Sequence, residues 1–184
     1  VLLGNLDPNH QLDVLNQMKN PKFVIMDTMN FWIEGYRKKL DEIISKVDLI
    51  SVNDEEAKQL TNSQSTIDSA YKLQAMGPKN VIIKKGEHGA ILFCDKKIFQ
   101  VPAFPIKKIF DPTGAGDSFI GGFAGSLSEK KQVSFQAMKT AAVIGTAIAS
   151  FTVQQFGTKE LENLTLLKLN KRIKEFKSLI DFEI

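Results

Sequence analysis

Short apolar runs alternate with amphipathic stretches along the first hundred residues, and this alternation restricts the folds open to the chain. Four runs are predicted to be buried strands: residues 1–5, 22–27, 48–52 and 80–85. Helices are predicted between them: one around Leu12 to Met18, one ending near Val47, and two short ones over residues 54–60 and 66–77. Strands that alternate with helices pair in parallel, and helices cover both faces of such a sheet. We therefore expect an α/β three-layer sandwich with a mostly parallel central sheet.

The pattern changes after the fourth strand. Residues 86–104 hold two further strand-like runs joined at the polar tip from Asp95 to Lys97, which predicts an antiparallel pair at one edge of the sheet. Beyond Pro112 the sequence is helical in three pieces, divided near Ser128 and Phe156.

Length and composition fit one globular domain. With 184 residues, of which 43% are hydrophobic and 24% charged, the chain can bury a core of its own. No repeat or linker marks a boundary, so we expect a single domain over residues 1–184. Lys and Arg total 24 against 21 Asp and Glu, a surplus too small to indicate a nucleic-acid partner. The basic run at residues 168–177 is typical of a solvated helix face.

Cysteine content and apolar run lengths exclude other classes. Cys94 is the only cysteine, so the chain can build neither a disulfide framework nor a cysteine metal site, which suits a reducing, cytoplasmic compartment. The longest apolar run, residues 141–151, is far shorter than the roughly 20 residues that a membrane helix needs, so we expect no membrane partner. The chain begins without methionine on what looks like the interior of a strand, so we expect an amino-terminal part to precede it.

Polar residues follow the predicted parallel strands at the end where ligands collect in such sheets. They are Asp27 and Asn30 after the second strand, Asn53 and Glu56 after the third, and Lys84 to Gly86 after the fourth. A further loop carries FDPTGAGDSFIGGFAG, residues 110–125. We expect these loops to converge on one crevice.

The glycines of this last segment indicate an anion site. A helix that begins near Ala115 leaves its first N–H groups unpaired at its positive end, and Gly114 and Gly116 let a phosphate approach them. A carboxylate there would weaken phosphate binding, so Asp117 is better explained as a base that accepts a hydroxyl proton. A tight turn in which Asp117 compensates the helix dipole explains the same spacing, and both interpretations stay open.

Other phosphate motifs fit less well. A P-loop requires GxxxxGK followed by Ser or Thr, and no such string occurs. If the dinucleotide fingerprint GxGxxG is aligned on Gly114 and Gly116, its third glycine falls at Phe119, so that motif does not match.

The segment DPTGAGDSFIGGFA resembles the carboxyl-terminal signature of the ribokinase-like carbohydrate kinases, the phosphofructokinase-B-type family that includes ribokinase, adenosine kinase and fructokinase. NDEE resembles the Asn-x-x-Glu element of that family. VIIKKGEHGAILF resembles its nucleotide segment, and AAVIGTAIASF the small-residue helix that follows. The similarity covers nearly all of the chain. It implies a transferase that uses ATP and Mg²⁺ to phosphorylate a hydroxyl of a small-molecule sugar or nucleoside acceptor.

The resemblance also implies residue roles. Asp117 would be the catalytic base, with Gly114, Ala115 and Gly116 as the anion hole. Asn53 would bind the nucleotide, and Glu56 would hold Mg²⁺ through water. The same two residues also have the spacing of a helix capping box, and the two roles are compatible. The remaining implied sites are Lys84, Gly86, Ala142 and Thr146 for the nucleotide, and Asp111 and Thr113 for a monovalent cation such as K⁺.

One departure from the family concerns the acceptor. Relatives carry an amino-terminal region with a diglycine motif and a small lid of strands, and nothing in this chain corresponds to it. We therefore expect the chain to be the ATP-binding portion of a longer kinase and to be inactive alone. The full-length protein could form a homodimer. The alternative is a nucleotide-binding or regulatory fragment that lacks an acceptor site.

Overall fold

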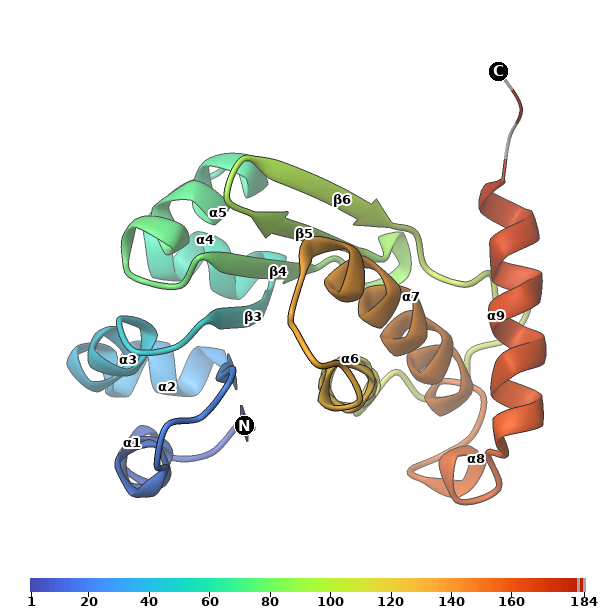
Figure 1. Cartoon of the computed structure of the whole chain (residues 1–184), viewed down its shortest axis with the longest axis horizontal. Helices are drawn as coiled ribbons and strands as arrows, with labels where there is room; N and C mark the ends of the chain where they lie inside the picture. Colours follow the sequence, from blue (N-terminus) through green and yellow to red (C-terminus); the bar gives the residue numbers. More distant parts are fainter. Residues whose placement is uncertain (182, 184) are drawn as a thin grey trace. The chain divides into compact units, whose positions relative to one another are not determined.

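The computed structural model of the protein describes residues 1–181 and 183. Its internal contacts form two compact units, which we call unit 1 (Val1–Gln100) and unit 2 (residue 101 onward). Unit 1 holds nearly all of the sheet, whereas unit 2 is mainly helical (Figure 1). The single domain expected over residues 1–184 stays a prediction.

The described strands form one six-stranded sheet, ordered as they occur in the chain. They are β1 (Leu2–Leu3), β2 (Ile25–Asp27), β3 (Leu49–Asn53), β4 (Asn80–Lys84), β5 (Ala90–Cys94) and β6 (Lys97–Val101). Neighbours from β1 to β4 are parallel, and β5 runs antiparallel to β4. Asp95, with φ of +49°, turns the chain into β6, whose arrow in Figure 1 points opposite to that of β5. The mostly parallel sheet with an antiparallel edge is therefore confirmed.

The helices of unit 1 lie between successive strands. They are α1 (Pro8–Gln17), α2 (Asn30–Gly35), α3 (Arg37–Ile44), α4 (Asp54–Thr61) and α5 (Thr66–Ala75), followed by the 3₁₀ turn η1 (Gly86–His88). The prediction of one helix ending near Val47 was wrong, because the segment is divided at Tyr36 into α2 and α3. Gly35, which is a poor helix former, precedes the break.

One face of the sheet shares an apolar core with these helices. Met26, Ile50 and Ile83 of the strands are fully buried in the same cluster as Leu40 of α3 and Leu73 of α5. Because side chains alternate between the faces of a strand, this cluster occupies one face and leaves the intervening residues on the other. The polar strand-end residues described below belong to that other face.

Unit 2 contains α6 (Ala115–Ser128), α7 (Phe135–Thr152), α8 (Lys159–Glu162) and α9 (Leu166–Ile180). α6 and α7 approach closely at glycines: a Cβ on Gly145 would lie 2.5 Å from the Phe119 carbonyl oxygen, and one on Gly122 would lie 2.7 Å from Ile148 Cδ1. A larger residue at Gly145 would meet backbone and force the helices apart, whereas at Gly122 it would first displace the tip of the Ile148 side chain.

The helix start predicted near Ala115 is confirmed. After Phe156, however, two helices replace the single predicted piece, because Thr165 caps a new helix by accepting a hydrogen bond from the Lys168 amide. Across the described residues, no helix combines the length and apolar character needed to cross a membrane.

Candidate active site

The carboxyl ends of β2, β3 and β4 lie side by side because these strands are parallel neighbours. The register pairs Asp27 with Ser51 and Asn53 with Lys84. Paired residues, and residues two apart along a strand, project from the same face of a sheet. Asp27, Asn53 and Lys84 therefore belong to one face, and the structure brings together the polar residues that follow these strands in the sequence.

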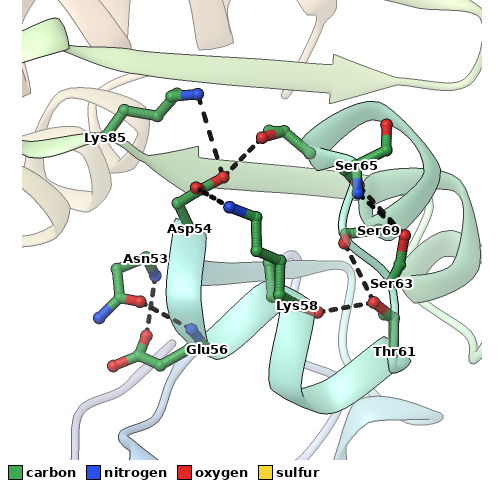
Figure 2. Close-up of polar contacts among 11 residues, drawn as sticks. Asn53, Asp54, Glu56, Lys58, Thr61, Ser63, Ser65, Ser69 and Lys85 are labelled. Carbon is green, nitrogen blue, oxygen red and sulfur yellow. Dashed lines mark hydrogen bonds and ion pairs between the residues drawn. The ribbon is translucent and has the colours of Figure 1, made fainter.

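Asn53 and Glu56 form a complete capping box at the start of α4 (Figure 2). The Glu56 amide donates to Asn53 Oδ1, and the Asn53 amide donates to Glu56 Oε2, each over 2.8 Å. This confirms the capping role, whereas the metal role stays a prediction. Among the described residues, nothing donates a hydrogen bond to the second carboxylate oxygen of Glu56, Oε1.

The environment of Glu56 opposes ionisation of its carboxyl group. The residue is only 6% exposed, and burial raises its pKa above the ordinary value. The hydrogen bond from Asn53 and the positive charge of Lys84 act in the opposite direction, while the negative charge of Asp27 adds to the rise. A cation near Oε1 would favour the ionised form.

Lys84 is engaged with Asp27 in an ion pair across the face of β3. Its Nζ lies 2.8 Å from Oδ2 and 3.0 Å from Oδ1 of Asp27, and the two side chains are 17% and 4% exposed. Asp27 Oδ1 also accepts a hydrogen bond from the Thr28 amide. The phosphate contact expected of Lys84 stays a prediction, and it would have to compete with this carboxylate or share the ammonium with it.

Asp54 connects three segments beside the capping box (Figure 2). Its carboxylate accepts from Lys58 Nζ and from the Thr66 hydroxyl, each over 2.6 Å, and lies 4.0 Å from Lys85 Nζ. Asp54 thereby links the first turn of α4 to the start of α5 and to the residue that follows β4.

Gly86 adopts a backbone conformation that favours glycine. Its φ is +54°, and a Cβ there would meet nothing within 4 Å. The positive φ rather than close packing therefore explains the glycine. The chain turns at this point, and the nucleotide contact of Gly86 stays a prediction.

The first turn of α6 has the geometry expected of an anion site. Gly114 is the N-cap with φ of +77°, and no side chain caps the helix. The Ala115 amide donates to the Pro112 carbonyl oxygen over 3.1 Å. The amides of Gly116 and Asp117 donate to no acceptor within the described part of the chain.

Asp117 lies in this same first turn, and its side chain is exposed. A carboxylate here also compensates the helix dipole. Both interpretations of Asp117 therefore fit the geometry, and its catalytic role stays a prediction.

Asp111 and Thr113 form a local turn just before the helix. The Thr113 amide donates to Asp111 Oδ1 over 2.9 Å. This backbone hydrogen bond, the Thr113 side chain and the Gly157 amide lower the pKa of Asp111. An ionised carboxylate suits a cation ligand, and the monovalent cation site stays a prediction.

Ala142 and Thr146 lie one turn apart on α7 and are 1% and 7% exposed. Both belong to the buried face of the helix. Their contact with a nucleotide stays a prediction.

Each unit, taken by itself, offers groups that suit a metal ion or a phosphate. Mg²⁺ prefers oxygen ligands, keeps several waters, and is commonly held by one or two carboxylates together with substrate phosphates. Glu56 offers one unsatisfied carboxylate oxygen, and the amides of Gly116 and Asp117 can donate to an anion. Over the described residues, no three or more His, Cys, Asp or Glu side chains gather into a metal site.

Comparison with known proteins shows the family of the chain. Residues 9–164 match the sequence profile of the pfkB family carbohydrate kinases. The chain belongs to this family. It is 38% identical over 131 residues to a cytidine kinase of Thermococcus kodakarensis, an alignment that covers 68% of this chain and 46% of that protein.

Solved structures of carbohydrate kinases share the fold. A ribokinase from Thermotoga maritima has a TM-score of 0.75 at 27% identity, over 94% of this chain and 56% of that one. A fructokinase from Vibrio cholerae, solved with fructose, ADP and a potassium ion, has a TM-score of 0.79 at 20% identity, over 90% and 55%. The ribokinase-like α/β fold and the family resemblance are thus confirmed, and the chain spans about half the length of these carbohydrate kinases.

Some contacts around the site were not predicted from the sequence. The pairing of Asp27 with Lys84 joins residues 57 positions apart, and the contacts of Asp54 reach two other segments. The position of Asp27 at a strand end was visible in the sequence, but its partner was not.

Proposed function

We propose that the full-length protein is a kinase that transfers a phosphoryl group from ATP to a hydroxyl of a sugar or nucleoside. Membership of the pfkB family supports this class of reaction. The observation that carries the proposal is the first turn of α6, where unpaired amides of Gly116 and Asp117 lie in the same turn as an exposed carboxylate. The turn offers both the donors and the base that phosphoryl transfer needs.

Asp117 accepts the proton of the acceptor hydroxyl while the oxygen of that hydroxyl attacks the terminal phosphorus of ATP. The backbone from Gly114 to Gly116 is assigned as the anion hole for the negative charge that develops on the transferring group. The Gly116 amide is unpaired and can donate to that charge, whereas the Ala115 amide would first have to leave the Pro112 carbonyl oxygen. When bound, ATP supplies that group and Mg²⁺ neutralises part of its charge. Glu56 would hold Mg²⁺ through a water at Oε1, since Oε2 is occupied in capping α4.

The remaining site residues bind the nucleotide or a monovalent cation. Asn53, Lys84, Gly86, Ala142 and Thr146 are assigned to the nucleotide, and Asp111 and Thr113 to K⁺. The lone cysteine suits a cytoplasmic protein in a reducing compartment. The acceptor stays open between two classes, because the similar proteins include a cytidine kinase as well as a ribokinase and a fructokinase.

The test is an acceptor screen on the full-length protein. ADP release would be measured with ATP, with and without Mg²⁺, against a panel that includes cytidine, ribose and fructose, and the product would be identified by mass spectrometry. We expect Mg²⁺-dependent ADP release matched by one phosphorylated acceptor class. ATP binding without phosphorylation of any acceptor would overturn the kinase proposal and favour a nucleotide-binding module.

A further inference from the structure

The segment of residues 110–118, which carries the anion-hole residues, is anchored at both ends to one point of α7. At its start, the Phe110 amide donates to the Val153 carbonyl oxygen over 2.9 Å. At its end, the Thr152 hydroxyl donates to Ser118 Oγ over 2.8 Å. Thr152 and Val153 are consecutive residues, so the carboxyl end of α7 fixes both the entry to this segment and its exit.

The Thr152 hydroxyl is a buried group committed to another helix. Thr152 is 4% exposed, and its hydrogen bond spans 34 residues. A threonine within a helix can instead bond to a carbonyl of its own preceding turn, as Thr140 does with Gln136 at 3.2 Å. The structure directs Thr152 to Ser118, the residue that follows Asp117.

The first turn of α6 depends on few other restraints. No side chain caps it, the Gly116 and Asp117 amides are unpaired within the described chain, and Gly114 has the conformational freedom of glycine. The close contact between Gly145 and the Phe119 carbonyl fixes the helix one residue beyond Ser118. Among the side-chain hydrogen bonds of the described residues, the one from the Thr152 hydroxyl therefore joins this turn to another helix.

We propose that Thr152 is a positioning residue that orients Asp117 through Ser118. This inference rests on the proposed function, in which Asp117 is the base. A displacement of about 1 Å in a reacting group can cost about 10²-fold in rate, so one hydrogen bond at this point influences catalysis without touching substrate.

The test uses the full-length kinase with hydroxyl deletions at matched sites. Thr152→Val and Ser118→Ala each remove one side of the contact, and Thr152→Ser retains the hydroxyl. Ser150→Ala is the control, because Ser150 is 6% exposed on the same helix and its hydroxyl contacts Ala147 and Arg172 rather than α6.

We expect Thr152→Val and Ser118→Ala each to lower kcat about 5- to 10-fold, the scale of one hydrogen bond, with KM for ATP changed less than about twofold. Thr152→Ser should restore kcat. Ser150→Ala should lower the unfolding midpoint while kcat stays at the wild-type value.

A second background separates positioning from general destabilisation. In Asp117→Asn protein, Thr152→Val should cause no further loss of kcat, because the group that it positions is gone. An equal loss in both backgrounds, or a lowered midpoint with unchanged kcat, would overturn the role of Thr152 and leave the proposed function standing. Retained turnover in Asp117→Asn alone would instead overturn the base assignment, and the positioning role with it.

Discussion

The Lys84 ammonium lies within 3.0 Å of both carboxylate oxygens of Asp27, at the ends of two strands that flank β3. The carboxylate is 4% exposed and the lysine side chain 17%. In such a pair, loss of one partner removes the opposite charge that lies nearest to the other buried group. The pair therefore affects stability as well as any role of Lys84 in nucleotide binding.

Lys84→Met should lower the free energy of unfolding of the full-length protein by about 3 to 5 kcal/mol, because Asp27 loses its counter-charge. Adding Asp27→Asn to that variant should recover much of the loss. Urea unfolding of the two single variants and the double variant measures the coupling. A double variant no more stable than Lys84→Met would show that the charges do not depend on each other.

Nucleotide affinity tests the other role of Lys84. If its ammonium contacts the phosphates, Lys84→Ala should weaken ATP binding by roughly 1.5 to 3 kcal/mol, the scale of a hydrogen bond to a charged group. Lys85→Ala is the matched control, since its ammonium lies 4.0 Å from Asp54 instead. Calorimetry with unchanged ATP affinity in Lys84→Ala would restrict Lys84 to its pairing with Asp27.

The sequence predicted those parts of the fold that depend on local pattern. Apolar runs located β2, β3 and β4, and the glycines on either side of Ala115 located the start of α6. Helix boundaries that depend on one residue were harder to predict. The break at Tyr36 and the cap at Thr165 lie inside stretches in which the apolar residues keep a helical spacing, so the spacing does not reveal them.

The candidate site was predictable residue by residue but not contact by contact. Strand ends marked Asn53 and Lys84, because a parallel sheet gathers such residues at one end. Gly114 was marked separately, as the glycine before a helix start. The partners of these residues depend on tertiary packing. Neither the Asp27–Lys84 pair nor the Thr152–Ser118 hydrogen bond has a local sequence pattern.

Gly114, at the start of α6, and Gly125, within the same helix, allow a matched comparison of how alanine is tolerated. A Cβ would meet nothing within 4 Å at either Gly114 or Gly125, but only Gly114 has a positive φ, +77°. Gly114→Ala should cost about 1 kcal/mol in the free energy of unfolding through backbone strain, and should also lower kcat. Gly125→Ala should be neutral or stabilise the helix by up to about 1 kcal/mol. Equal effects of the two substitutions on stability and kcat would contradict the account of Gly114.

The raised pKa of Glu56 predicts a pH dependence of stability. Because the folded protein holds this proton more tightly than the unfolded chain, the contribution of Glu56 is fully present at acidic pH and declines as pH rises past the ordinary glutamate pKa. Glu56→Gln can keep the capping hydrogen bonds without the titration. The stability of the wild type relative to Glu56→Gln should therefore fall as the pH rises above the ordinary glutamate pKa, as measured by denaturant unfolding at a series of pH values. A constant difference would mean that burial does not shift this group.

Asp117 carries the central claim of a kinase mechanism. Asp117→Asn keeps the shape of the residue and the start of α6 but removes the charge and the ability to accept a proton. If Asp117 only compensates the helix dipole, its neutralisation should lower the unfolding midpoint with little direct effect on rate. If it is the base, turnover should fall while the fold and the nucleotide site persist.

The most direct measurement is the turnover of the full-length Asp117→Asn kinase with its acceptor, taken together with its ATP affinity and unfolding midpoint. The account predicts a loss of turnover of about 10²- to 10⁴-fold, with ATP binding retained or tightened because a negative charge beside the phosphates has gone. Near-normal turnover with a lowered midpoint would contradict it and leave Asp117 as a residue of the helix start alone.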